Sequence, residues 1–206
     1  MEEKILTIKN WLGAGSINIF GLPMSGKDTQ GERLAEVLGA KLLSSGAIIR
    51  EMEVKTQNDM TKNGKLVPTN VFYQWVLPYF ERKELAGMPL VFSSIGRWAG
   101  EENQVMSVAA GAGHETKAVI FLGLSDEEVR QRFAFAKVLK DRGERSDDAD
   151  PEVFETRLKE FYEKTVPVLD HYEALELLIR VNGAQSREAV FEEIIEKLYK
   201  KAISRG

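Results

Sequence analysis

The sequence contains no cysteine and only two histidines, His114 and His171. Disulfide bonds, thiolate metal ligands and thiol nucleophiles are therefore excluded, and the chain is compatible with a reducing compartment without requiring one. Any imidazole chemistry would have to come from these two residues. His114 lies in the glycine-rich stretch AAGAGHET, which reads as a helix end followed by a loop, so we expect its side chain to face solvent.

The chain also lacks an excess of positive charge. Its 206 residues carry 32 acidic and 28 basic side chains, which gives a formal net charge of −4. No overall positive field draws the protein to nucleic acid or to an anionic membrane, so any anion site must be local. With this charge we expect neither nucleic-acid nor membrane partners, and we expect the protein to be cytoplasmic. No sustained heptad or long edge strand is visible, so we expect a monomer.

Long apolar runs are missing as well. The first residues, MEEKILTIKNWL, are acidic at their start and contain no long apolar run, so we expect neither a signal peptide nor a membrane anchor. Their pattern predicts a short amphipathic helix.

What is present is the composition of a globular protein, with 43% hydrophobic and 29% charged residues, which predicts one domain over residues 1–206. β-Rich runs alternate with helical patterns, and Ser125 with Glu128 forms a capping box at the start of one helix. This alternation predicts an α/β fold with a central parallel five-stranded sheet flanked by helices. The five expected strands are SINIF, KLLSS, PLVFSSI, KAVIFLGL and LELLIRV.

The stretch GLPMSGKDTQ, residues 21–30, follows the first of these strands and opens a helix. In that setting backbone N–H groups converge on phosphate oxygens, the helix dipole favours an anion, and Lys27 adds a positive charge. A plain glycine turn before a capped helix would not explain proline, serine and lysine together. We therefore expect nucleoside triphosphate binding by Gly21, Pro23, Ser25, Gly26, Lys27, Asp28 and Thr29.

This loop resembles the G-x-P-x-S-G-K-x-T-Q loop of adenylate kinase and its nucleoside monophosphate kinase relatives. Other segments resemble that family in the same order along the chain. SSGAIIRE resembles its G-D-x-x-R segment, GKLVP its G-x-L-V-P turn, SIGRW its F-P-R segment, RGERSDD the edge of its lid, and VNG the loop that holds the donor base. The resemblance runs from Gly21 to Gly183.

The resemblance implies a P-loop nucleoside triphosphate hydrolase-like fold and reversible, Mg²⁺-dependent transfer of the γ-phosphoryl group of ATP to a nucleoside monophosphate. It also implies a helical insertion that binds the monophosphate, over residues 45–85, and a short lid over residues 137–150. The lid is too short for the zinc-bearing form of the long family members, and without cysteine we expect no zinc.

Roles for individual residues also follow from the resemblance. Phosphoryl transfer brings negative charges together, and arginine forks bind phosphate oxygens in pairs while staying charged. The implied catalytic residues are Lys27, Arg97, Arg145 and Arg157. Arg132, Arg142, Gly183 and Ala184 would complete the donor site, with Arg132 stacked on the base. The implied acceptor residues are Ser45, Gly46, Arg50, Leu66, Val67, Gly96, Arg97, Glu101 and Gln104.

Three departures from the family pattern concern magnesium binding. Ala47 and Ser93 occupy places where aspartates usually help to hold water around magnesium, while Asp28 has appeared in the loop. A carboxylate close to phosphates repels them unless a divalent cation lies between, so we hypothesise that Asp28, with Thr29, takes over part of the magnesium binding. The alternative is that Asp28 points away and only favours the helix dipole.

The acceptor base is open. Adenylate enzymes carry a glutamine four residues after the acceptor arginine, and this chain has Glu101 there, with Gln104 close behind. An ionised carboxylate accepts hydrogen bonds but cannot donate, which suits the amino groups of adenine, guanine or cytosine and disfavours uracil. AMP is the first choice, GMP and CMP stay open, and UMP is expected to be the poorest acceptor. Gln104 could reach the base instead.

Two other functions are compatible with the departures. The first is a nucleotide-binding protein without turnover, because Ala47, Ser93 and Gly96 all differ from the acceptor-side pattern. The second is a P-loop kinase for a small molecule that is not a nucleotide. The retained arginines argue against the first and the GKLVP turn against the second.

Overall fold

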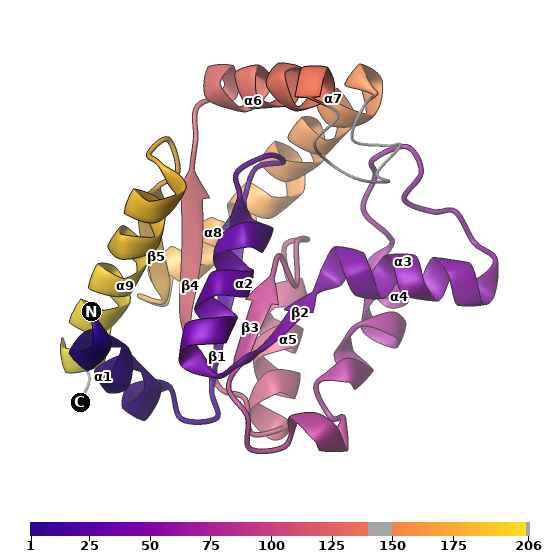
Figure 1. Cartoon of the computed structure of the whole chain (residues 1–206). Helices are drawn as coiled ribbons and strands as arrows, with labels where there is room; N and C mark the ends of the chain where they lie inside the picture. The colour runs from indigo at the N-terminus through magenta and orange to yellow at the C-terminus, as the bar shows by residue number, and fades with distance from the viewer. Residues whose placement is uncertain (140–149, 205–206) are drawn as a thin grey trace.

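A computed structural model describes residues 1–139 and 150–204 of the chain (Figure 1). Within these residues, five strands form one parallel sheet in the order β2-β3-β1-β4-β5. The strands are β1 Ser16–Gly21, β2 Lys41–Ser44, β3 Leu90–Ser93, β4 Thr116–Gly123 and β5 Leu178–Asn182. The predicted α/β class and the five-stranded parallel sheet are confirmed.

Helices lie on both faces of this sheet, as Figure 1 shows. Their bounds in the described part of the chain are α1 Glu2–Leu12, α2 Lys27–Leu38, α3 Ser45–Thr56, α4 Thr69–Trp75, α5 Glu101–Gly111, α6 Asp126–Leu139, α7 Pro151–Glu160, α8 Val166–Ala174 and α9 Arg187–Ser204. Short 3₁₀ turns occupy Leu77–Tyr79 and Lys83–Leu85. None of the described helices is long and apolar enough to cross a membrane.

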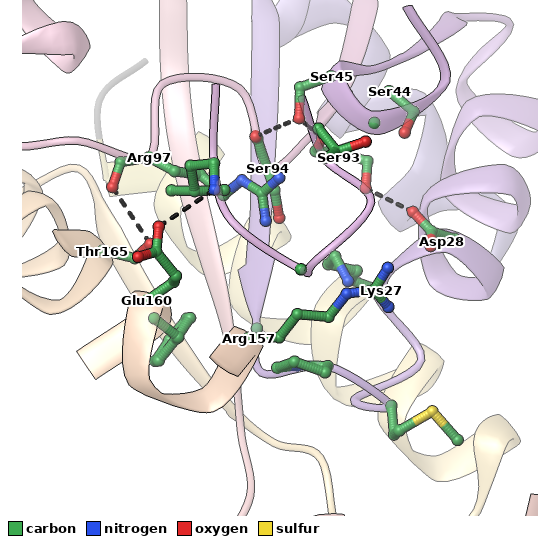
Figure 2. Close-up of a pocket in the computed structure, with 18 of the residues that line it drawn as sticks. Lys27, Asp28, Ser44, Ser45, Ser93, Ser94, Arg97, Arg157, Glu160 and Thr165 are labelled. Carbon is green, nitrogen blue, oxygen red and sulfur yellow. Dashed lines mark hydrogen bonds between the residues drawn. The ribbon is translucent and has the colours of Figure 1, made fainter. Parts of the chain in front are cut away.

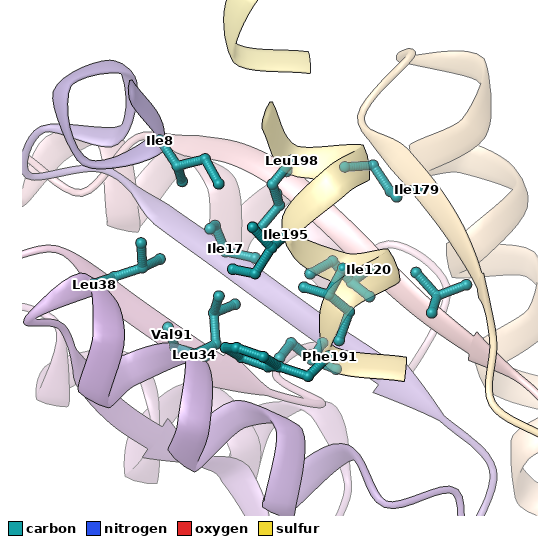
Figure 3. Packing of buried hydrophobic residues seen from close by; sticks show 14 of the residues in the cluster. Ile8, Ile17, Leu34, Leu38, Val91, Ile120, Ile179, Phe191, Ile195 and Leu198 are labelled. Atoms are coloured by element: carbon teal, nitrogen blue, oxygen red, sulfur yellow. The ribbon is translucent and has the colours of Figure 1, made fainter. Parts of the chain in front are cut away.

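Alternation along the strands divides the core. Ile17 and Ile19 of β1 pack with α1, α2 and α9. Figure 3 shows Ile17 among the side chains of this cluster. Phe20 packs instead with α6, α7 and α8. The predicted amino-terminal helix α1 is confirmed, and it buries Ile8 and Leu12 against this first cluster. Because both faces of the sheet are covered, its central strands β1 and β3 are buried along their whole length.

The chain between β2 and β3 forms α3, α4 and the two 3₁₀ turns. Its apolar side chains join a third cluster with β3 and α5, in which the rings of Phe80 and Phe92 stack at 4.8 Å between centroids. This helical segment is the part of the chain for which we predict acceptor binding, and the cluster anchors it to β2 and β3 of the sheet.

A single π-helical turn, Phe161–Thr165, joins α7 to α8. Proline lacks an N–H group and its ring collides with the carbonyl four residues earlier, so Pro167 cannot continue a regular α-helix from Glu163. Widening the helix by one residue accommodates this defect, and such π-turns are frequent at functional sites. The turn lies where the helix passes the exit of β3, because Thr165 Oγ1 donates a hydrogen bond to the carbonyl of Arg97.

Two local expectations have opposite outcomes. The capping box is confirmed, because Glu128 accepts from the backbone N–H of Ser125 at 2.8 Å and Ser125 Oγ accepts from that of Glu128 at 3.3 Å. The expectation for His114 is wrong. Its side chain is 1% exposed, and Nδ1 lies 3.0 Å from the carbonyl oxygen of Ala14. The loop that carries it packs inward at the amino end of the sheet, where Ser16 Oγ donates to the His114 carbonyl.

Candidate active site

The glycine loop curls tightly between β1 and α2. A Cβ atom on Gly21 would lie 2.4 Å from Ser25 Oγ, so the loop can close over the strand end only with glycine there. Gly26 has a φ of 86°, in the left-handed region, and Met24 has a φ of 66°. These turns place Lys27 at the first position of α2, where helical N–H groups point at a bound anion.

A cavity of about 460 Å³ opens above this loop, at the carboxyl ends of the strands. Figure 2 shows Lys27, Arg157 and Arg97 around it. The predicted site residues that line the cavity are Gly21, Pro23, Gly26, Lys27, Asp28, Thr29, Ser45, Gly46, Arg50, Leu66, Val67, Arg97 and Arg157. The donor loop and the acceptor segments, which are far apart in the sequence, therefore share one cavity.

Several contacts hold Arg97 in the loop that leaves β3. The buried side chain of Asn18 donates to the Ile95 carbonyl at 2.8 Å, and its oxygen accepts from the Ile95 N–H at 3.3 Å. Glu101 accepts from the backbone N–H of Arg97 at 3.0 Å. Thr165 bonds to the Arg97 carbonyl. The backbone of Arg97 is thus bound on both sides, which fixes where its guanidinium enters the cavity.

Positive charge is concentrated in the cavity. Burial, together with the neighbouring Arg157 guanidinium, lowers the pKa of Arg97 to about 10, while the carboxylates of Glu101, Asp28 and Glu160 partly oppose the shift. The pKa still lies well above neutral, so Arg97 stays charged. Two guanidinium groups that repel each other in a partly buried cavity form a site that an anion would stabilise.

Asp28 is directed to the exit of β3. Its Oδ1 accepts a hydrogen bond from Ser93 Oγ at 2.6 Å, and both residues line the cavity (Figure 2). Ser93 is one of the two positions where the sequence lacks an expected aspartate. A carboxylate on α2 and a hydroxyl on β3 therefore stand together where the phosphate-binding loop meets the acceptor side.

Both carboxylate oxygens of Glu101 accept hydrogen bonds from the protein itself. It is 2% exposed, and Oε1 accepts from Thr69 Oγ1 at 2.8 Å, while Oε2 accepts from the N–H groups of Arg97 and Trp98. Burial raises its pKa above the ordinary value, against the lowering effect of these hydrogen bonds. Glu101 and Gly96 line a small side pocket of about 20 Å³ that adjoins the main cavity. Base reading by Glu101 stays a prediction, with most of its acceptor capacity already used.

The remaining predicted residues lie around the cavity or outside it. The Arg132 guanidinium donates to the carbonyls of Met24, Ser25 and Gly183, so it joins the glycine loop to the loop after β5. Ala184 follows in that loop, and its N–H bonds to Asn182 Oδ1. Ser25 is buried, and Gln104 is exposed on α5. Arg142, Arg145 and most of the predicted lid, residues 137–150, lie outside the described residues.

Other residues of the cavity were not predicted from the sequence. Glu160 and Arg187 both line it. Glu160 follows Arg157 by three positions on α7, so helical spacing places the two side chains on one face, and that spacing could have identified it. Arg187 is the first residue of α9, and its carbonyl accepts from Gln30 Nε2 at 2.9 Å. No local sequence pattern indicates that position.

Comparison with known proteins agrees with this geometry. Residues 19–177 match the family model described as adenylate kinase. The chain is 28% identical over 193 residues to an adenylate kinase of Bacteroides thetaiotaomicron, covering 90% of this chain and 98% of the relative. It is 32% identical over 181 residues to an adenylate kinase of Synechococcus sp., covering 84% and 91%.

A relative with a different name matches to a similar extent. The UMP-CMP kinase 3 of Arabidopsis thaliana is 30% identical over 184 residues, covering 85% of this chain and 86% of the relative. The family match spans most of the chain, including the glycine loop, the acceptor turn, the Arg97 loop and α7. The chain therefore belongs to the adenylate kinase family of phosphotransferases.

Proposed function

We propose that the protein is an adenylate kinase, which transfers the γ-phosphoryl group of ATP reversibly to AMP. The observation that carries this proposal is the shared cavity, in which Lys27 of the donor loop lies with Arg50, Arg97 and Arg157. Two anionic nucleotides bind side by side only where their negative charge is compensated. These four cationic side chains would supply that compensation.

Each part of the cavity has a task in this reaction. The glycine loop and Lys27 hold the donor phosphates through N–H groups and a point charge. Arg50 and Arg97 hold the acceptor phosphate, and Arg157, from α7, compensates charge on the transferring group. No protein nucleophile is needed, because the acceptor phosphate attacks directly. These groups of the described part of the chain bind and align the phosphates and neutralise their charge. Arg145 of the predicted lid would add one more positive charge.

Magnesium fits the donor side. The Asp28 carboxylate and the Thr29 hydroxyl both line the cavity and are the oxygen ligands that Mg²⁺ prefers. Among the described residues there is no group of three or more acidic or histidine side chains that could hold a metal by themselves. We therefore propose that Asp28 and Thr29 hold the ion from one side while water and nucleotide phosphates complete its shell. The bound ion would neutralise phosphate charge.

CMP is the second candidate acceptor, because a relative of similar identity is named UMP-CMP kinase 3. GMP stays open, since Glu101 also suits its amino group. Glu101, which lines the side pocket, stands where adenylate enzymes carry a glutamine. A nucleotide-binding protein without turnover is less well supported, because it has little use for arginines at the point of transfer.

We also propose that the protein works as a monomer in the cytoplasm, without nucleic-acid or membrane partners. The net charge of −4 and the absence of cysteine support this assignment. Size-exclusion chromatography with light scattering tests the oligomeric state, since a monomer has a mass of 23.2 kDa.

The test of the proposed function is phosphoryl transfer from ATP and Mg²⁺ to AMP, GMP, CMP and UMP in parallel, with Lys27→Ala as the control. We expect turnover that prefers AMP, is poorest with UMP, and is lost in the control. A preference for CMP would replace AMP as acceptor and keep the reaction type. Binding of ATP without transfer to any of the four would contradict the proposal.

A further inference from the structure

A carboxylate lies on the acceptor side of the cavity, where phosphoryl transfer does not require one. Glu160, the last residue of α7, is 9% exposed and lines the cavity that also contains Arg97 and Arg157. A negative charge near bound phosphates repels them. Its presence in the cavity therefore calls for a separate physical reason.

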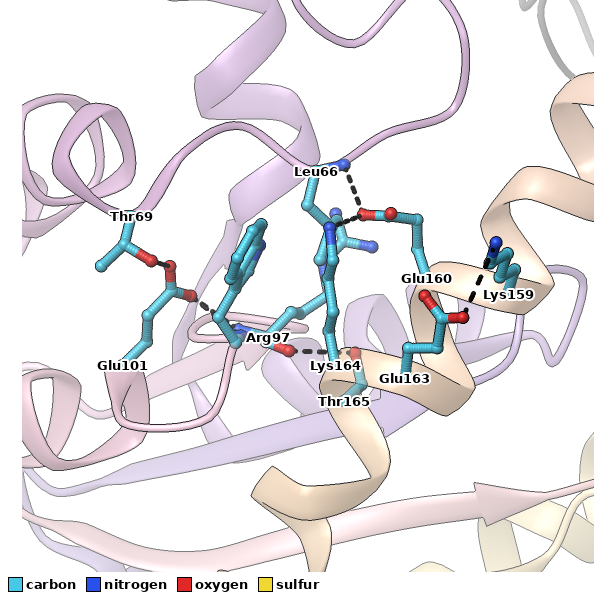
Figure 4. Close-up of polar contacts among 10 residues, drawn as sticks. Leu66, Thr69, Arg97, Glu101, Lys159, Glu160, Glu163, Lys164 and Thr165 are labelled. Carbon is cyan, nitrogen blue, oxygen red and sulfur yellow. Dashed lines mark hydrogen bonds and ion pairs between the residues drawn. The ribbon is translucent and has the colours of Figure 1, made fainter.

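One oxygen of this carboxylate is used by the protein. Glu160 Oε2 accepts from the backbone N–H of Leu66 at 3.1 Å and from Lys164 Nζ at 2.6 Å (Figure 4). The Lys164 ammonium also lies 3.9 Å from the centre of the Trp98 ring. Lys164 thus balances the charge of Glu160, and the N–H of Leu66 holds the carboxylate against the acceptor turn.

The other oxygen, Oε1, makes no hydrogen bond with the part of the chain that the structure describes. An ionised carboxylate can accept hydrogen bonds at both of its oxygens. A carboxylate fixed through one oxygen, with the other unused beside a ligand cavity, is prepared to accept a hydrogen bond from a ligand.

The chemistry of nucleotides restricts which ligand group that is. Phosphate oxygens at neutral pH offer almost no donors, whereas the ribose carries hydroxyl donors one linkage away from the phosphate. Glu160 contacts Leu66 of the acceptor turn, and Figure 2 shows it on the Arg97 side of the cavity, away from Asp28. The ribose hydroxyls of a nucleotide lie closer to its 5′-phosphate than the amino groups of its base do. An acceptor whose phosphate binds at Arg97 would therefore bring its ribose hydroxyls nearest to Glu160.

We propose that Glu160 Oε1 accepts a hydrogen bond from a ribose hydroxyl of the acceptor and so selects ribonucleotides over the deoxy forms that lack that hydroxyl. This inference rests on the proposed function, because it requires that a nucleoside monophosphate binds beside Arg97. The bond is charge-assisted, which makes it stronger than a bond between neutral groups. Glu160 is thereby a residue of acceptor selection as well as a support for Leu66.

The experiment measures dissociation constants for the best-accepted monophosphate and for its 2′-deoxy and 3′-deoxy forms. We expect one deoxy form to bind the wild type about tenfold to a hundredfold more weakly, the range for a hydrogen bond to a charged group. In Glu160→Ala this ratio should fall to about one, and in Glu160→Gln to an intermediate value. Because it compares ligands within one variant, the ratio is independent of any general loss of affinity.

Glu163→Gln is the matched control. Glu163 lies three positions further along, its side chain is 55% exposed, and within the described part of the chain it forms an ion pair with Lys159 at 3.7 Å. It should keep the wild-type ratio. Equal binding of all three ligands by the wild type would overturn the inference alone, as would a Glu160→Ala variant that keeps the ratio while binding all ligands more weakly. Failure of the wild type to bind any monophosphate would overturn the proposed function as well.

Discussion

Asp28 and Ser93 share a hydrogen bond, so substitutions at these two positions can transfer a carboxylate from one side of the cavity to the other while the net charge stays the same. The two side chains meet at 2.6 Å, one from α2 and one from β3. Asp28→Asn removes the charge but keeps the shape and an acceptor oxygen. Ser93→Asp places a second carboxylate opposite the first. The double variant carries a single charge again, now on β3.

The magnitudes follow from this geometry. Losing a partner around a metal site typically lowers metal affinity or activity about 10- to 100-fold, so Asp28→Asn should weaken the apparent Mg²⁺ affinity by that amount. Two unit charges about 4 Å apart repel by about 4 kcal/mol at an effective dielectric constant of about 20, so Ser93→Asp should lower the melting temperature without metal. The double variant should recover most of the Mg²⁺ affinity and of the stability.

Two assays read these effects. Turnover is titrated with Mg²⁺ at fixed ATP, and binding of Mn²⁺ in the presence of a non-hydrolysable donor is followed by electron paramagnetic resonance. An Asp28→Asn enzyme with the wild-type Mg²⁺ dependence would refute the proposed role of this carboxylate. A double variant no better than Asp28→Asn would show that the charge acts only from α2.

Two further predictions concern the acceptor side. Gly64 has a φ of 76°, and a Cβ atom there would lie 2.7 Å from the Val153 carbonyl, so Gly64→Ala should push the acceptor turn off α7 and raise the acceptor KM about tenfold or more, with the ATP KM little changed. Gly87→Ala, with a φ of 75° and no atom within 4 Å, carries the same backbone strain and should leave the acceptor KM unchanged. Burial raises the pKa of Glu101, so its contribution to stability is present below the ordinary pKa of 4.5 and is lost as the pH rises through the raised value. Thermal unfolding between pH 4 and pH 8 should show a smaller fall in Glu101→Gln than in the wild type, and identical pH profiles would contradict this.

The parts of the fold that depend on near neighbours could be predicted from the sequence. The strands, the glycine loop and the Ser125 capping box each follow from residues a few positions apart, and all are present. The identity of the strand neighbours does not follow in this way, because β1 pairs with β3 and β4 rather than with β2.

The site depends more on contacts across the chain. Asp28 and Ser93 are 65 residues apart, so neither residue alone indicates the hydrogen bond between them. His114 is buried because its loop packs at the amino end of the sheet, which a glycine-rich composition conceals. Glu101 was predicted from its spacing to Arg97, but its contacts with Thr69 and the Arg97 loop come from tertiary packing.

The central claim is that one cavity binds donor and acceptor nucleotides together. The most direct test supplies ATP labelled with ³²P in its γ-phosphoryl group, together with Mg²⁺ and AMP, and measures which product carries the label. If the cavity holds donor and acceptor together, the label should appear in the β-phosphoryl group of ADP with almost no labelled inorganic phosphate, and Arg97→Ala should slow its appearance strongly. Release of the label as inorganic phosphate, at a rate that does not depend on AMP, would contradict the claim that this cavity joins two nucleotides.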